Sequence, residues 1–260
     1  MLKKLILISG LLLLPFQINA QIIPPALGKT NLNSWFAFGV NQKLDTLKVG
    51  GWKSTTYMGI GTISHKHQSN PFKDIGIGVI NQEFYHNFAP NWQYSLALSY
   101  RQQYLFAEEV PFEKTKQAYK QEFRWYGRFS YTLKLNKLTI TPTFRQEIIK
   151  YFTPNYENHI ESWRLRSRFR LKFAFPLTSD NSHQLIAYSE QLFSTSQHSK
   201  TKKWDKFEYA DSRFAIYYSL SPLKHSFTYN FGYMHNLIGS KNTFSGHYIA
   251  LDIIWKNPFG

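Results

Sequence analysis

The stretch from Trp163 to Leu177, W-R-L-R-S-R-F-R-L-K-F-A-F-P-L, alternates between two kinds of side chain. One set of alternate positions holds Trp163, Leu165, Ser167, Phe169, Leu171, Phe173, Phe175 and Leu177. The positions between them hold Arg164, Arg166, Arg168, Arg170 and Lys172. Successive side chains of a β-strand point to opposite faces, so the stretch predicts a strand with one apolar face and one cationic face.

The length of this stretch narrows the fold further. Strands of globular proteins usually have about five or six residues, whereas a strand that crosses a bilayer at a tilt needs roughly nine to eleven. Strands of outer-membrane barrels are apolar toward the lipid and polar toward the lumen. The stretch therefore predicts a transmembrane strand of an all-β protein, an antiparallel up-and-down β-barrel.

The N-terminus has the pattern of an export signal. Lys3 and Lys4 precede an apolar run from Leu5 to Leu14, and Ala20 is a small residue at a suitable cleavage position. We expect the protein to reach the outer membrane of a Gram-negative type of envelope. The expected organisation is a cleaved signal peptide at residues 1–20, a periplasmic lead at 21–33 and an outer-membrane barrel at 34–260.

The composition bounds the partners of the protein. Without any cysteine, the chain has no disulfides and no thiolate chemistry. The net charge is +15, and in an exported protein such an excess favours anionic lipids or acidic solutes over nucleic acid. The expected partners are membrane lipids and the outer-membrane assembly machinery, with acidic small molecules or oligosaccharides as candidate ligands. We expect no cofactor and no nucleic acid.

Eleven segments have strand-like alternation. They span residues 34–44, 52–64, 75–88, 92–103, 122–134, 139–148, 163–177, 183–193, 213–220, 223–236 and 246–255. The first two have less regular faces than the others. Because bacterial single-chain barrels have even numbers of strands, we expect twelve, with one strand near the N-terminus unrecognised, or ten, with one of the first two segments outside the wall.

Tight turns alternate with longer polar connections. The turns lie at residues 89–91 and 136–137, and the longer connections at 106–119, 153–161, 194–207 and 237–245. Outer-membrane barrels have short periplasmic turns and longer outside loops. We therefore expect Asn136 in the periplasm and Ser199 outside the cell.

Three segments resemble an uncharacterised outer-membrane family, the domain of unknown function 2490. They are N-F-A-P-N-W-Q-Y-S-L-A-L-S-Y-R at 87–101, F-R-W-Y-G-R-F-S-Y-T-L-K-L-N-K-L-T-I at 123–140 and E-S-W-R-L-R-S-R-F-R-L at 161–171. From about Ile75 to the C-terminus, the order of elements is similar to that of the family. The resemblance implies an outer-membrane barrel and supplies no catalytic residues.

The inward faces of the predicted strands form the candidate site, with eleven cations against five carboxylates. The candidate anion-binding residues are Arg124, Arg128, Arg145, Arg164, Arg166, Arg168, Arg170 and Lys172, and the other inward cations are Arg101, Lys134 and Arg213. The candidate counter-charges are Glu83, Glu122, Glu147 and Glu190, and Asp252 also faces inward. Two interpretations remain open: a lumen packed with salt-bridged side chains, and a porin-like track that binds or passes anions.

Patterns for catalysis and metal binding are weak. His65 and His67 could lie on one side of an extended segment, but no further ligands accompany them. Ser219 and Ser221 precede His225, yet no recognisable triad surrounds them. We therefore expect neither an enzyme nor a metal site, with an outer-membrane acyl hydrolase or transferase as the catalytic alternative.

Overall fold

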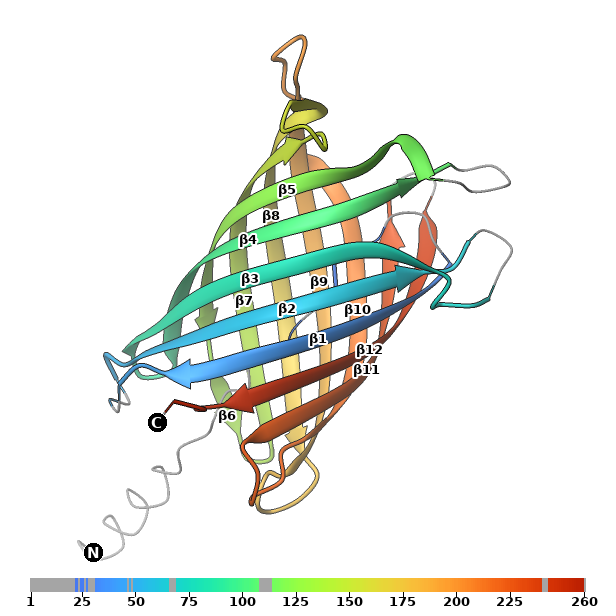
Figure 1. Ribbon diagram of the computed structural model, residues 1–260. Coiled ribbons are helices and arrows are strands. Elements are labelled where there is room, and N and C mark those ends of the chain that lie inside the picture. The colour runs from blue at the N-terminus through green and yellow to red at the C-terminus, as the bar shows by residue number, and fades with distance from the viewer. Residues whose placement is uncertain are drawn as a thin grey trace, which may run out of the picture.

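The computed structural model describes residues 22, 24, 25, 27, 31–45, 47, 49–65, 69–107, 114–239 and 243–259. Twelve strands in this part of the chain form a closed barrel (Figure 1). No helix among the described residues is long and apolar enough to cross a membrane. The predicted signal peptide, residues 1–20, lies outside the described residues, and so does His67.

The strands follow one another around the wall in chain order. They are β1 (Leu32–Lys43), β2 (Trp52–Ile63), β3 (Asp74–Ala89), β4 (Trp92–Phe106), β5 (Lys114–Tyr131), β6 (Leu133–Leu135), β7 (Leu138–Phe152), β8 (Asn158–Pro176), β9 (His183–His198), β10 (Glu208–Leu220), β11 (Phe227–Ile238) and β12 (Phe244–Lys256). Every pair of neighbours is antiparallel except β1 and β12.

Strands β5 and β6 form a single line of the wall. Both pair with β7 in one continuous register, and only Thr132 separates them. Pro142 of β7 lies beside this break and has no N–H to donate to the ladder. Thr132 donates its backbone N–H to the carbonyl oxygen of Asn91 instead, at 2.9 Å.

The wall closes through the parallel pair of β1 and β12, in which Leu32 lies opposite His247 and Asn41 opposite Lys256. Strands that alternate in direction have parallel ends only when their number is odd, so the closed wall has eleven lines. The eleven segments found in the sequence correspond to these lines. The total of twelve strands is as expected, but the twelfth, β6, lies between β5 and β7 and not near the N-terminus, so the wall has an odd number of lines instead of the expected even number. The first two segments, β1 and β2, both lie in the wall.

The strands extend beyond the segments in which the sequence alternates. Because β5 begins at Lys114 and β9 ends at His198, the connections expected at 106–119 and 194–207 are shorter than predicted. Backbone pairing does not require two different faces, so the ladders continue past the alternation. The two predicted tight turns are present, with Asn91 and Asn136 at φ values of 67° and 46°, which asparagine tolerates.

The outer surface of the wall is apolar. Phe169 and Leu171 of β8 are 52% and 40% exposed. Arg168, which points inward, is only 4% exposed. Phe38 of β1 and Ile249 of β12 are 48% and 54% exposed on the other side of the barrel. The two faces predicted for the stretch from Trp163 to Leu177 are therefore present.

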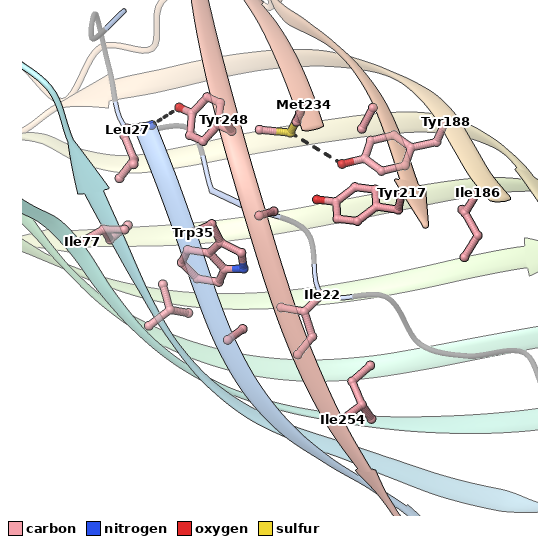
Figure 2. Packing of buried hydrophobic residues seen from close by; sticks show 14 of the residues in the cluster. Ile22, Leu27, Trp35, Ile77, Ile186, Tyr188, Tyr217, Met234, Tyr248 and Ile254 are labelled. Atoms are coloured by element: carbon pink, nitrogen blue, oxygen red, sulfur yellow. Dashed lines mark hydrogen bonds between the residues drawn. The ribbon is translucent and has the colours of Figure 1, made fainter. Parts of the chain in front are cut away.

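Four described residues ahead of β1, Ile22, Pro24, Pro25 and Leu27, lie inside the barrel, and we call them the N-terminal segment. Ile22 and Leu27 are 3% and 6% exposed and belong to a cluster of buried apolar side chains (Figure 2). Leu27 donates its backbone N–H to the hydroxyl oxygen of Tyr248 at 2.8 Å. A Cβ atom on Gly39 would lie 3.0 Å from Cδ1 of Ile22, so glycine permits this close approach to β1.

Apolar side chains fill the interior along β1 to β3 and β9 to β12. They are Ile22, Leu27, Trp35, Ala37, Ile63, Ile77, Val79, Ile186, Tyr188, Ala215, Tyr217, Met234, Tyr248, Ala250 and Ile254. Figure 2 shows Trp35, Tyr217 and Tyr248 within this cluster. We call these residues the apolar half of the interior. In the first two sequence segments, apolar residues point both outward and inward. This is why the two faces of these segments differ less clearly than those of the others.

Candidate functional site

Glu147 of β7 lies at the centre of the charged part of the interior and is fully buried. Its Oε2 accepts a hydrogen bond from Nη1 of Arg124 at 2.9 Å. Its Oε1 lies 2.6 Å from Nε of Arg145 and 2.8 Å from Nε of Arg168. Nη1 of Arg166 is 3.9 Å from Oε2. One carboxylate therefore faces four guanidinium groups, which reach it from β5, β7 and β8.

Further ion pairs extend from this centre in both directions. Toward β4, Glu122 accepts a hydrogen bond from Nε of Arg124 at 2.8 Å and lies 3.5 Å from Nε of Arg101. Toward β10, Glu190 lies 3.3 Å from Arg168 and 3.6 Å from Arg213. A continuous chain of charges thus follows the inner face of the wall from β4 to β10. We call it the ion-pair network, and its residues are Arg101, Glu122, Arg124, Arg145, Glu147, Arg166, Arg168, Glu190, Asp211 and Arg213.

Glu83 of β3 has its own set of partners. Its Oε1 accepts a hydrogen bond from Ser95 at 2.5 Å, and its Oε2 accepts one from the Tyr126 hydroxyl at 2.8 Å. Nη2 of Arg128 donates to the same Oε2 at 3.1 Å. The guanidinium of Arg145 stacks over the Tyr126 ring, 3.4 Å from its centre. The two carboxylates Glu83 and Glu147 are therefore linked through an aromatic ring and an arginine.

Among the interior cations, Lys53, Arg170 and Lys172 have no carboxylate within 4 Å in the described part of the chain, and neither has Lys120 of β5. Lys53 lies 5.3 Å from the centre of the Tyr85 ring, and Arg170 lies 5.8 Å from that of Tyr188. Arg170 and Lys53 are close enough to repel Lys172. Cations therefore exceed carboxylates near the end of the barrel where β8 finishes and β2 begins.

The structure places the predicted site residues on the inward face but divides them into groups. Arg124, Arg145, Arg166, Arg168, Glu122, Glu147 and Glu190 belong to the ion-pair network, and Arg128 pairs with Glu83. Arg164 pairs with Glu161 near the start of β8. Asp252 is fully buried on β12 and joins no ion pair within the described residues. The predicted inward position of Lys134 differs from the structure, where β6 is exposed on both faces.

Two interior residues were missed by the sequence pattern. Asp211, 3.1 Å from Nε of Arg213, lies before the segment recognised at 213–220, although alternation extends back to it. Lys53 belongs to a segment with irregular faces. A search for alternating charges beyond the apolar core of each segment could have found Asp211.

Two small cavities remain among these side chains. The larger, of about 30 Å³, is lined by Ile22, Pro24, Pro25, Thr55, Tyr57, Glu83, Tyr85, Arg101, Arg128, Arg145, Arg168 and Arg213. The smaller, of about 10 Å³, is lined by Arg128, Thr143, Arg145, Arg168, Arg170 and Glu190. Arg128, Arg145 and Arg168 line both. Since a water needs about 10–15 Å³ of such space, the larger cavity has room for roughly two waters.

The structure brings together no catalytic or metal-binding group from the sequence patterns. Nε2 of His65 lies beside a carboxylate oxygen of Asp74. Ser219 is buried on the inner face of β10, while His225 lies in the following turn and donates its backbone N–H to Pro222 at 3.2 Å. Within the described residues, no three His, Cys, Asp or Glu side chains are grouped to hold a metal ion.

Comparison with known proteins gives a family but no activity. Residues 32–246 match the model of a family described as protein of unknown function (DUF2490). This match covers most of the chain, including all strands from β1 to β11, and the chain therefore belongs to that family. No curated protein matches the chain.

Proposed function

We propose that this DUF2490 member is an integral outer-membrane β-barrel whose closed, cation-rich interior binds anionic solutes without passing them freely. The observation that carries the proposal is the inverted arrangement of side chains. Large apolar groups such as Phe169 and Phe38 cover the outer surface, while arginines and glutamates lie inside. Burying charged groups costs hydration, and exposing large apolar groups to water is unfavourable. This arrangement is therefore favoured where the outer surface contacts lipid rather than water.

The sequence supports export to that location. The basic start, the apolar run and Ala20 favour a cleaved signal peptide. Lipids and the outer-membrane assembly machinery are then the first partners of the chain. Acidic small molecules are the ligands that the interior charge favours, whereas acidic oligosaccharides exceed the space of the cavities.

Two features support a closed interior. The ion-pair network joins neighbouring strands inside the barrel from β4 to β10, and Glu147 at its centre is fully buried. On the other side, Ile22 and Leu27 of the N-terminal segment occupy the space beside β1 and β2. Side chains fill the interiors of small barrels in the same manner.

The excess of cations over carboxylates in the interior supports the proposed binding of anions. Lys53, Arg170 and Lys172 have no carboxylate partner within the described part of the chain, and four arginines share Glu147. Guanidinium groups suit carboxylates and oxyanions because they offer paired N–H donors. We propose no enzymatic role. Ser245 lies 2.5 Å from Nε2 of His235, but among the described residues no carboxylate pairs with this histidine to orient it.

The membrane location can be tested by comparing boiled and unboiled protein on a semi-native gel, together with extraction of membranes by carbonate. A folded barrel should migrate differently from the boiled chain and remain with the membrane. Identical mobility together with release by carbonate would contradict the proposal.

The closed interior can be tested by recording planar bilayers in a salt gradient. We expect no steady conductance from the wild-type protein. A steady anion-selective current would contradict the closed interior and indicate a channel. A steady cation-selective current would contradict both the closed interior and the preference for anions. A silent bilayer with no anion binding would favour the second candidate, a structural or partner-binding barrel with a filled interior.

A further inference from the structure

We propose that the larger interior cavity binds one small inorganic anion, held by Arg128, Arg145 and Arg168 and covered by the N-terminal segment. This inference rests on the proposed function, since it locates the anion binding of the same interior. It narrows the ligand from acidic solutes in general to a halide or, at most, a compact oxyanion.

The charge around the cavity is unbalanced. Five arginines line it, against a single carboxylate, that of Glu83. Both oxygens of Glu83 are already engaged by Ser95, Tyr126 and Arg128. The carboxylates that pair with the other arginines do not line this cavity. An anion in the cavity would therefore face positive charge on several sides.

Two of the arginines that line the cavity have buried hydrogen-bond donors without acceptors. Nε of Arg128 and Nη2 of Arg145 are buried, and neither has an acceptor among the described residues. Buried polar groups in native proteins nearly always have partners, and charged donors are the most costly to leave unpaired. A small anion supplies the missing acceptor and offsets the charge at the same time.

The size and cover of the cavity select the ligand. A volume of about 30 Å³ corresponds to roughly two waters, which suits a halide and excludes an oligosaccharide. Ile22, Pro24 and Pro25 close one side. Pro24 and Pro25 have no N–H to donate, so the charged donors for the anion come from the arginines.

The test is thermal unfolding of the purified full-length protein in detergent, with sodium chloride, phosphate or gluconate at one ionic strength. Gluconate is too large for the cavity. A bound ligand raises the unfolding temperature with the logarithm of its concentration, whereas screening depends only on ionic strength. We expect chloride to raise the unfolding temperature above its value in gluconate. A larger shift in phosphate would identify the ligand as an oxyanion.

The variant Arg145→Gln identifies the site. Glu147 keeps Arg124 and Arg168 when Arg145 is changed, so its carboxylate is not left unpaired. We expect this variant to need at least tenfold more chloride for the same shift. The control Lys120→Gln removes one positive charge of a residue that lines neither cavity, and it should keep the wild-type response. If Arg145→Gln does not fold, Arg128→Gln serves as the second variant.

Equal unfolding temperatures in chloride and gluconate would overturn the inference, and so would an undiminished chloride response of Arg145→Gln. Neither result would affect the gel, extraction and bilayer tests of the proposed function. A heat-modifiable, silent barrel with no preference for chloride would remove only the anion site.

Discussion

The two halves of the barrel interior differ in the forces that hold them. The apolar half packs Trp35, Met234 and Tyr248 around the N-terminal segment, and burial of apolar surface has no preferred direction. The ion-pair network instead depends on partners: Glu147 is stable inside the barrel only because arginines surround it. The outer surfaces of the two halves are alike. One alternating pattern can therefore encode two interiors, since only the inward residues differ.

The largest expected effect comes from removing the centre of the network. Glu147→Gln leaves four guanidinium groups without their shared carboxylate, and breaking a buried ion pair in this way costs about 3–5 kcal/mol. Urea unfolding followed by gel mobility would measure the loss. Glu161→Gln is the matched control, because its pair with Arg164 is partly exposed and such pairs contribute about 0.2–1 kcal/mol. A decrease of less than about 1 kcal/mol in the free energy of unfolding for Glu147→Gln would mean that the ion-pair network does not stabilise the barrel.

Much of the arrangement of the ion-pair network could be predicted from the sequence. Arginines at every second position from Arg164 to Arg170 specify one face of a strand, and the tight turn at 136–137 fixes β5, β6 and β7 as neighbours. The individual partners could not be predicted. Glu147 meets Arg124 and Arg168 because of the register between three strands, and a one-residue slip would turn each side chain to the opposite face.

The apolar half was predicted less well, for a topological reason. Alternation identifies strands but does not indicate which two of them close the wall. The parallel closure places the start of β1 and the end of β12 at opposite ends of the barrel. The described residues ahead of β1 lie along the inside of the wall, with Leu27 beside Tyr248 and Ile22 beside Gly39 further along β1. Because no periodic pattern marks residues 21–33, the sequence could not predict this position.

The next prediction tests whether the two halves share one outer environment. Phe169→Arg on the side of the network and Phe38→Arg on the apolar side should each destabilise the barrel by about 2–4 kcal/mol if both face the bilayer near its midplane. Folding into lipid vesicles at a series of urea concentrations would measure both. Ser167→Arg, on the same face as Phe169, should cost less if it lies nearer an interface. A cost for only one of the two phenylalanines would show that the outer surfaces differ.

A smaller effect is expected from the N-terminal segment. Leu27→Ala should reduce the free energy of unfolding by about 2 kcal/mol, at the lower end of the range for buried leucines. The reason is that a segment inside the barrel that is not itself a strand of the wall can relax into the space that is left. The same unfolding measurement applies. Leu47→Ala is the control, since Leu47 is 64% exposed and its loss should be within about 0.5 kcal/mol. Equal effects for the two leucines would mean that the segment contributes nothing to the apolar half.

The smallest expected effect is the coupling between the halves. Trp35 and Glu147 lie on β1 and β7, and no hydrogen bond or ion pair of the described residues joins them. Mutations at separate sites without shared partners are usually additive within about 0.3–0.5 kcal/mol. We therefore expect the losses for Trp35→Ala and Glu147→Gln to sum in the double variant, as measured by urea unfolding. Arg124→Gln combined with Glu147→Gln provides the opposite case, because these two side chains share a hydrogen bond and should deviate strongly from additivity. A coupling of Trp35 to Glu147 as large as that of Arg124 would mean that the interior is one cooperative unit, in which packing around the N-terminal segment sets the geometry of the ion pairs.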